Sequence, residues 1–430
     1  MQSMKKFSYI PFILLFLLPA LFSCGEDRTY EYNELTKENQ WIYSQMKESY
    51  LWGDSIKKPG QKEFFAAPTK FFKSLLVAGD GASFFTDTTS AVSYGFAFAT
   101  MRDPLGERPS KVYALVLYVE PGSPAHAAGL ERGMWISTVG GKALSTSSNS
   151  QLLSGGATEL ITEYIDYDEE YYWAGTDTIQ LPAAVEINPE PIVIDTIYNV
   201  RDLRVGYILC NNFNGNGFAR DVEGIISDYC SANVTDVVID LRYNTGGSVA
   251  NASLFASALV PNASVGTTFC ELKGKNSTND TTYCYTEQAF GLGDKNVYII
   301  TGAATKGTAQ LFAESLNNTR SMYDLFILGS NGTGANLYTE PGVSPYGFTI
   351  NPAVAYIYSS SGNKLPTTGV NVDYQLEELY NVMNIQQLGN TQEQMLFNVL
   401  YLIVNGALPN TVAPARAMQI HTLSTKPFTK

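Results

Sequence analysis

An apolar run that ends in a polar, glycine-rich loop is the first feature of this sequence that could support chemistry. Residues 237–241 are followed by Arg242, Asn244 and the pair Gly246-Gly247. Glycines let a backbone pass close to a neighbouring group and can leave amide N–H groups aimed at a developing negative charge. A tight turn that requires glycine fits the same residues. We therefore expect Gly246 and Gly247 to form an oxyanion-type loop, to serve as turn glycines, or to do both.

A second apolar run, residues 297–301, leads through a short loop into a predicted helix that begins at Thr308. Thr308 is a candidate nucleophile and Lys306 a candidate base, and they stand on either side of Gly307. One step along a helix turns a side chain by about 100°, so neither residue points where a side chain at position 307 would point. A Thr–Lys pair needs a desolvated Lys within hydrogen-bond reach. A solvated loop charge is the alternative interpretation of Lys306.

The composition restricts the classes of function. With two histidines, His126 and His421, in 430 residues, a histidine-based triad or a multi-histidine metal site is nearly excluded. The formal net charge of −13 argues against a nucleic-acid partner, because phosphate binding needs clustered Lys and Arg. Hydrophobic residues make up 45% and charged residues 16%, as in globular proteins. The length predicts two or three domains, and no cofactor or metal is predicted.

The middle of the chain, residues 91–190, is predicted to be rich in β-strands. A strong strand over 112–119 ends in Pro-Gly-Ser-Pro-Ala at 121–125, and Ala-Gly-Leu follows at 128–130. This turn begins a short helix, which stops before the next strand at 135–139. The segment resembles the PDZ domains of bacterial processing and HtrA-type proteases, which usually have Asp where this sequence has Met at position 134.

The PDZ resemblance implies a binding activity. A PDZ groove binds a peptide by strand addition and holds its terminal carboxylate on backbone amides. The resemblance places the carboxylate-binding loop at Tyr94, Gly95, Phe96, Ala97 and Phe98, where the small Gly95 lets the backbone approach the ligand. Peptide or protein C-termini are therefore the expected partners. A PDZ-like domain that only packs against its neighbour is the alternative.

The C-terminal half, residues 195–406, alternates strand and helix patterns, which predicts an α/β layer with a largely parallel sheet. A small helical region is expected before the β-rich part, over residues 34–90. The predicted strands of the C-terminal half cover 205–209, 234–241, 297–301 and 325–328, and the predicted helices cover 218–232, 248–259, 308–316 and about 394–404.

The loop after residues 237–241 is similar to the Asp-Leu-Arg-x-Asn-x-Gly-Gly signature of S41 (C-terminal processing) peptidases, with Thr245 in place of the common Gly. The resemblance implies a ClpP/crotonase-like α/β domain over residues 195–406. It also implies that an amide near Gly246 or Gly247 helps to form the oxyanion hole. The expected fold class is therefore α/β multidomain, with a helical N-terminal region, a β-rich PDZ-like domain and an S41-type domain.

The same resemblance assigns a nucleophile position and a general-base position. In this sequence neither position has a reactive side chain. The family segment Thr-x3-Thr-Ala-Ser-Ala-Ser-Glu aligns through Thr301 and Thr305, which puts Gly307 at the nucleophile position. The family segment Gly-x-x-Thr-x-Gly-Lys aligns with residues 329–335 and puts Ala335 at the general-base position. Nucleophile and base act as a unit, so losing one removes the catalytic role of the other.

Three hypotheses of function follow. The first is a non-catalytic S41 homologue that binds peptide or protein C-termini. The second is an active endopeptidase with a displaced nucleophile, either serine-type or a Thr/Lys one that uses Thr308 as nucleophile and Lys306 as base. The third is a structural subunit of a surface complex. The fold alone does not choose among them, because function depends on the site.

The N-terminus predicts export and a lipid anchor. Basic residues precede an apolar run at 9–22, which is short for a membrane span, and the run ends at Ser23 and Cys24. Residues 1–24 resemble a bacterial lipoprotein signal peptide in which Cys24 is lipidated; a conventional signal peptide with an incidental Cys is the alternative. We expect a protein of the cell envelope that is anchored by lipid to the outer membrane, with a tether over residues 25–33. Exposure on the cell surface is a further possibility of this hypothesis.

Four further cysteines, Cys210, Cys230, Cys270 and Cys284, allow three disulfide pairings in an exported protein. Cys270 and Cys284 flank a polar stretch that reads as a hairpin loop, which favours this pair; four reduced thiols are the alternative. Residues 407–430 are expected to form a polar C-terminal tail.

Overall fold

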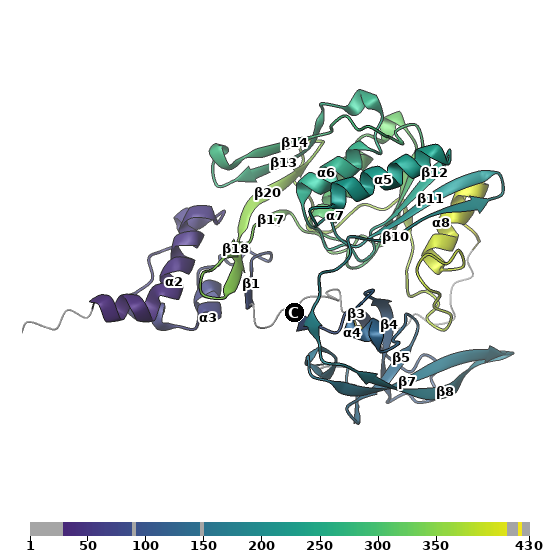
Figure 1. The fold of residues 1–430 in the computed structure, drawn as a ribbon, viewed down its shortest axis with the longest axis horizontal. Helices are drawn as coiled ribbons and strands as arrows, with labels where there is room; N and C mark the ends of the chain where they lie inside the picture. The colour runs from purple at the N-terminus through teal and green to yellow at the C-terminus, as the bar shows by residue number, and fades with distance from the viewer. Residues whose placement is uncertain (1–28, 88–91, 147–149, 411–419, 424–430) are drawn as a thin grey trace, which may run out of the picture.

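The computed structural model describes residues 29–87, 92–146, 150–410 and 420–423. The predicted signal peptide and Cys24 lie outside these residues. The chain forms an α/β multidomain protein with a small helical N-terminal region, a β-rich domain and a larger α/β domain (Figure 1). The fold class expected from the sequence is confirmed.

A six-stranded sheet forms the centre of the α/β domain. Its strand order is β10-β11-β12-β15-β16-β21. Every neighbouring pair from β11 to β21 is parallel, and β10 is antiparallel to β11. The predicted strands are confirmed, with small shifts of their ends. The strands are β10 (Ile192–Val200), β11 (Leu203–Cys210), β12 (Asp236–Asp240), β15 (Asn296–Thr301), β16 (Leu325–Gly329) and β21 (Tyr374–Gln375).

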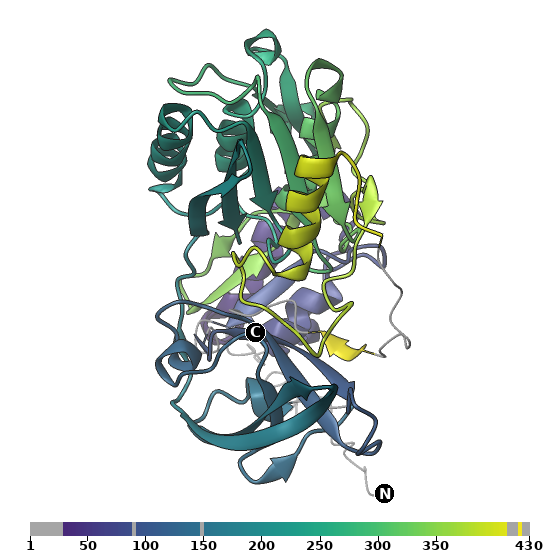
Figure 2. The same cartoon turned by 90° about the vertical axis from the view of Figure 1, so that its right-hand side faces the viewer.

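Helices cover both faces of this sheet (Figure 2). Successive side chains of a strand point to opposite faces, and β12 shows this directly. Val237 and Ile239 pack with the three helices of one face, whereas Val238 packs against the helix of the other. Strands buried on both faces appear in a sequence as continuous apolar runs. These strands could therefore be predicted from the sequence. The first face carries α5 (Phe218–Ser231), α6 (Val249–Ser257) and α7 (Thr308–Asn317), and the second carries α8 (Gln394–Asn405).

A smaller antiparallel sheet, in the order β14-β13-β20-β17, extends the α/β domain. The predicted hairpin is present, but its cysteines are free thiols. Cys270 lies opposite Tyr283, next to Cys284 in the chain. The register shifts at this point of the ladder, and the expected Cys270–Cys284 disulfide is not formed. The strands are β13 (Thr268–Gly274), β14 (Thr281–Cys284), β17 (Leu337–Thr339) and β20 (Ala353–Ser359).

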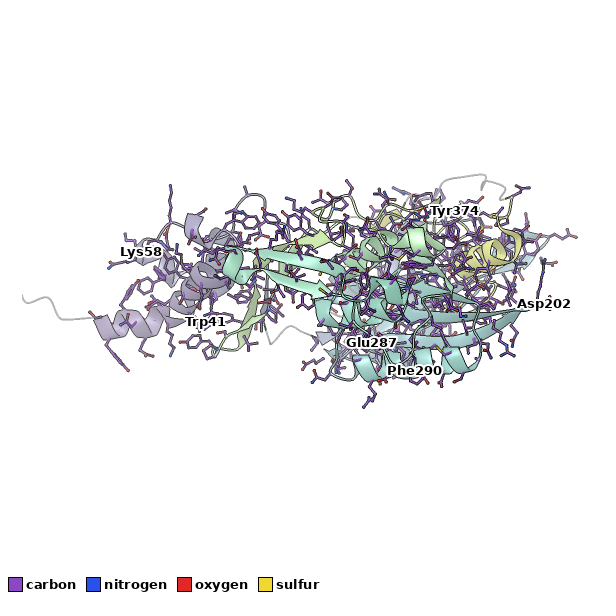
Figure 3. The ribbon with its side chains drawn as sticks, turned by 90° about the horizontal axis from the view of Figure 1, so that it is seen from above. Trp41, Lys58, Asp202, Glu287, Phe290 and Tyr374 are labelled. Atoms are coloured by element: carbon purple, nitrogen blue, oxygen red, sulfur yellow. The ribbon has the colours of Figure 1, made fainter. Side chains whose placement is uncertain are left out.

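The N-terminal region is completed by a distant part of the chain. Its strand β1 pairs with β19, and its apolar core includes Phe348 and Ile350. Trp41, labelled in Figure 3, packs edge-on against Phe348, with ring centroids 5.7 Å apart. The first helix begins at Thr29, so it takes up residues that were expected to belong to the tether. The elements are α2 (Thr29–Ser49), 3-10 turns at Gly53–Ser55 and Gln61–Phe65, α3 (Pro68–Ser74), β1 (Phe84–Asp87), β18 (Gly342–Val343) and β19 (Phe348–Asn351).

The β-rich domain, residues 92–186, contains a sheet in the order β22-β3-β4-β5-β7-β8. The strands predicted at 112–119 and 135–139 are confirmed. The long β7–β8 hairpin and β22, which lies within the expected polar tail, were not predicted. The elements are β2 (Val92–Ser93), β3 (Phe96–Arg102), β4 (Val112–Val119), α4 (Pro124–Ala127), β5 (Trp135–Val139), β6 (Lys142–Ala143), a 3-10 turn at Ser150–Leu153, β7 (Thr158–Asp168), β8 (Glu170–Leu181), β9 (Val185–Glu186) and β22 (Ile420–Leu423).

Candidate active site

Gly307 precedes the first residue of α7, at the carboxyl edge of the parallel sheet. Its backbone has φ 59° and ψ −123°, a conformation that residues with side chains rarely adopt. Several hydrolases expose a nucleophile on a strained strand-to-helix turn of this kind. A Cβ atom at position 307 would lie 3.5 Å from its nearest neighbour, the carbonyl oxygen of Thr245. The site therefore has the backbone shape and the room for a projecting side chain, but glycine supplies none.

The glycine-rich loop lies directly against this turn. A Cβ atom on Gly246 would be 3.2 Å from the Thr308 nitrogen, and one on Gly247 would be 2.8 Å from the Phe213 nitrogen. Both glycines have positive φ, 117° and 130°, so both are also turn glycines. The Gly246 amide donates to Asn244 Oδ1 at 2.8 Å, whereas the Gly247 amide has no acceptor among the residues that the structure describes. Of the two, Gly247 is the one with an amide available to a ligand oxygen.

The two candidate substitutes for the missing dyad are held by the same loop. Thr308 is 4% exposed, and its hydroxyl donates to the Gly247 carbonyl oxygen at 2.8 Å. A hydroxyl that donates its proton to a carbonyl is not oriented toward a base. The Lys306 backbone N–H donates to the Asn244 carbonyl oxygen, and its side chain is half-buried. In this arrangement Thr308 supports the loop.

The general-base position, Ala335, lies beside the first turn of α7. Its N–H donates to Gln310 Oε1 at 2.9 Å, and Gln310 Nε2 donates to the Pro366 carbonyl oxygen at 2.8 Å. Gln310 is fully buried and stands three residues after Gly307, so it extends from nearly the same side of the helix. The structure thus brings Gly307 and Ala335 to one place. Sequence reasoning missed Gln310, although a polar residue within an apolar helix was a signal for it.

The backbone around Ala335 has no room for the side chain that the family has at position 332. A Cβ atom on Gly332 would lie 2.3 Å from the Thr305 carbonyl oxygen. A Cβ atom on Gly369 would lie 1.8 Å from the Asn331 carbonyl oxygen, which accepts a hydrogen bond from the Val370 N–H at 2.7 Å. These loops pack backbone against backbone. The difference from the expected family segment therefore includes the shape of this loop as well as Ala335.

Other charged residues of the signature loop are buried in an ion-pair cluster. Arg242 bonds Asp240 Oδ2 at 2.7 Å and Glu393 Oε1 at 2.7 Å, and none of the three side chains is more than 1% exposed. Burial alone would raise the pKa of Glu393, but the charges of Arg242 and Arg132 outweigh it and lower the pKa to about 2. The Asp and Arg of the signature therefore tie β12 to the beginning of α8.

A cation from the β-rich domain completes this cluster. Arg132 is 3% exposed and bonds Glu378 at 2.7 Å and Glu393 at 3.4 Å. It also donates to the Tyr243 hydroxyl at 2.8 Å. Tyr243 belongs to the signature loop, so the β-rich domain contacts the α/β domain a few residues before Gly246 and Gly247.

The predicted carboxylate-binding loop is packed against the turn that follows β4. Gly95 has φ 83°, and a Cβ atom there would lie 2.2 Å from Ser123 Cβ. The Gly95 amide donates to Ser93 Oγ at 3.0 Å. The four neighbours that were predicted with Gly95, which are Tyr94, Phe96, Ala97 and Phe98, are buried in the β-rich domain. The loop leads into β3, whose two edges are occupied by β4 and β22.

The described part of the chain holds no group of three or more His, Cys, Asp and Glu residues that could bind a metal ion. Within the same residues, no helix combines the length and apolar character that crossing a membrane requires.

Comparison with known proteins agrees with this geometry. The family model for peptidase family S41 matches residues 204–376, and the model for the peptidase S41 N-terminal domain matches residues 37–89. A crystal structure of an S41 protease from Bacteroides fragilis is 25% identical, with a TM-score of 0.73, and the match covers 85% of this chain and 97% of that one.

The photosystem II D1 C-terminal processing protease is 17% identical, with a TM-score of 0.50, over 81% of this chain and 94% of its own, and it shares the fold. No curated protein matches the chain. The two family models, the shared fold and the loop and strand-to-helix turn described above establish that this chain belongs to peptidase family S41.

Proposed function

We propose that this protein is a non-catalytic member of the S41 family that binds peptide or protein C-termini through its PDZ-like β-rich domain. The observation that carries the proposal is Gly307. It occupies a strand-to-helix turn with φ 59°, beside an available amide of Gly247, where a nucleophile would stand. Glycine cannot form a covalent intermediate, and the Ala335 methyl group cannot accept a proton.

The base loop supports the same conclusion. Gly332 and Gly369 make backbone contacts that leave no room for side chains, and the Ala335 N–H is held by Gln310. The hydroxyl of Thr308, which follows Gly307 in the chain, donates to the Gly247 carbonyl oxygen. The site keeps its amides and has lost the groups that would use them, which favours binding without turnover.

Peptide binding is supported by the form of the β-rich domain. A glycine-containing loop leads directly into β3, and the far side of β3 from β4 accepts a further strand. Strand addition supplies affinity through main-chain hydrogen bonds. Together with the lipobox-like sequence before Cys24, this suggests a lipid-anchored binding protein of the cell envelope, on the outer membrane.

Proteolysis of unfolded casein tests the loss of catalysis. Purified protein of residues 25–430 is expected to leave casein intact. A Gly307→Ser/Ala335→Lys double variant, which returns a nucleophile and a base to the two positions, is expected to cleave it measurably. The Gly307→Ser single variant is the matched control, because it carries the nucleophile without the base. Cleavage by the wild type that Thr308→Ala abolishes would show instead a working peptidase with a displaced nucleophile.

Binding to a library of peptides with free C-termini tests the second half of the proposal. We expect the protein to retain some of these peptides and to lose them when their C-terminal carboxylate is amidated, because the loop amides would no longer meet a charge. Equal retention of free and amidated peptides, or no retention of either, would contradict C-terminal recognition.

A further inference from the structure

The C-terminal segment of the chain forms the edge strand of the β-rich sheet. Ile420 lies opposite Met101, and Leu423 opposite Ala99, in an antiparallel ladder with β3. Figure 2 shows β22 as a yellow arrow beside the strands of the β-rich domain. Since β4 covers the other side of β3, β22 occupies the side that a bound peptide would have to use.

The direction of β22 is the direction that a bound peptide would take. The loop that precedes β3 begins at Tyr94, so a ligand whose C-terminus reaches this loop must run antiparallel to β3. From Ile420 to Leu423 the tail runs antiparallel and moves from Met101 toward Ala99, which is toward that loop. Strand addition with this polarity is the mode of binding that the proposed function requires.

The charges of the tail and of the domain are complementary. From residue 394 to 430 the sequence holds Arg416, Lys426 and Lys430 and no Asp or Glu. Residues 92–186 hold twelve Asp or Glu against five Lys or Arg. A basic segment is therefore attracted to an acidic domain, which favours this strand over an acidic one from elsewhere.

The tail can reach β3 within one molecule. Helix α8 follows Glu393, which contacts Arg132 of the β-rich domain. Its twelve residues span about 18 Å, and the fourteen residues at 406–419 can cover up to about 46 Å when extended. The return from the end of the helix to the domain is therefore well within the length of the chain.

We infer that residues 420–423 are an internal ligand of the peptide-binding edge of β3, bound within the same molecule, so that an external peptide must displace them. The inference rests on the proposed peptide binding and adds a competitor to it. External ligands would share the chemistry of the tail, which is an extended, basic segment. Displacement of the tail would set the apparent affinity, because only the fraction of molecules with an open edge can bind.

A pair of proline substitutions tests this inference. Successive N–H groups of a strand point to opposite sides, so one of residues 422 and 423 directs its N–H at β3. Thr422→Pro/Leu423→Pro removes both donors and opens the edge, whereas Thr422→Ala/Leu423→Ala keeps both and is the control. The probe is a fluorescent peptide of residues 416–430, titrated into each protein of residues 25–430. The proline variant is expected to bind it about tenfold more tightly than the wild type or the control.

Hydrogen exchange of the amides at 99–101 provides a second readout, which does not depend on the probe. Faster exchange there in the proline variant, together with tighter probe binding, supports the inference. If library peptides with free C-termini bind wild type and proline variant equally, the internal-ligand inference is wrong and the proposed function stands.

If no peptide binds either protein while exchange at 99–101 still accelerates, β22 is a permanent structural strand. The internal-ligand inference and the proposed peptide binding are then both wrong. Self-association of the wild type that the proline variant loses would place the tail on a second copy, which overturns binding within one molecule.

Discussion

The two ends of the signature loop, residues 240–247, differ in the interactions that they make. Asp240 and Arg242, at its beginning, are fully buried and pair with each other, and Arg242 also pairs with Glu393. Gly246 and Gly247, at its end, face a turn at Gly307 that has no reactive side chain. One end carries buried ion pairs that join two domains, and the other carries close backbone packing beside a position, 307, that has no side chain. A motif of this kind is evidence for a fold first and for an activity only where its catalytic partners are present.

This difference predicts how much substitutions at the two ends change the free energy of unfolding. Side chains in the ion-pair cluster should be costly to replace, because a buried charge without its partner is strongly unfavourable. A side chain added at position 307 should cost less, because a Cβ atom there would meet its nearest neighbour, the Thr245 carbonyl oxygen, at an ordinary contact distance of 3.5 Å. The following predictions run from the largest expected effect to the smallest.

Replacing Arg242 should destabilise the protein most. Arg242→Met keeps much of the apolar volume but leaves Asp240 buried without a cation and Glu393 with Arg132 alone, which costs about 3–5 kcal/mol. Urea unfolding followed by tryptophan fluorescence measures the loss. The matched control is Arg220→Met, because the Arg220 side chain is 82% exposed in its pair with Asp221, and exposed pairs contribute about 0–1 kcal/mol. Equal effects of the two substitutions would contradict a structural role for the cluster.

Acid should weaken the same cluster. Because the folded pKa of Glu393 is lowered from 4.5 to about 2, its contribution is complete above pH 4.5 and is lost as the pH falls toward 2. The shift corresponds to roughly 3 kcal/mol. Urea unfolding of wild type and Glu393→Gln should therefore show a wide gap at pH 7 that narrows at pH 4 and again at pH 3. A gap that stays constant from pH 7 to pH 3 would show that Glu393 is not held as a carboxylate by its arginines.

Adding a methyl group at position 307 should destabilise the protein less than the loss of Arg242. Gly307→Ala meets its nearest neighbour at 3.5 Å, so the cost is the backbone strain of a positive φ, about 1–2 kcal/mol. Gly247→Ala is the comparison, because its Cβ would lie 2.8 Å from the Phe213 nitrogen, and it should cost at least twice as much. Thermal unfolding of the two variants measures the difference. Equal losses would mean that position 307 has no room for a side chain.

The sequence predicted the α/β layer because strands buried on both faces form apolar runs, as residues 237–239 do. It also placed Gly307 and Ala335, which the structure brings together at the first turn of α7 through Gln310. It did not predict that β19 completes the N-terminal region or that β22 joins β3. Both pairings join strands that are far apart in the chain, and a short strand carries too little pattern to name its partner.

The sequence did not reveal the partners of the charged residues in the signature loop. Asp240 pairs with Arg242, Arg242 also pairs with Glu393, and Glu393 in turn pairs with Arg132 of the β-rich domain. A charged residue within an apolar run is a local signal that a partner exists. The sequence cannot say where that partner lies, because only the packing of the two domains brings the four charges together.

A buried carboxyl without a cation provides the smallest test of the comparison. Glu120 is 1% exposed and accepts hydrogen bonds from the Tyr118 hydroxyl and the Glu190 N–H, at 2.8 and 2.9 Å. Burial raises its pKa, and these hydrogen bonds only partly offset the effect. The sign is opposite to that of Glu393, since the stability that a raised folded pKa contributes is present at low pH and is lost as the pH rises.

Glu120→Gln should therefore change stability by less than about 1 kcal/mol at pH 5, because the amide can hydrogen-bond both neighbours. Relative to the wild type, the variant should gain stability as the pH is raised to 8, because ionising the buried wild-type carboxyl becomes more favourable in the unfolded chain than in the folded protein. Urea unfolding at the two pH values measures this. If the wild type instead becomes more stable relative to the variant between pH 5 and pH 8, a cation stabilises the Glu120 carboxylate. The contrast between Glu120 and the arginine-bound Glu393 would then disappear.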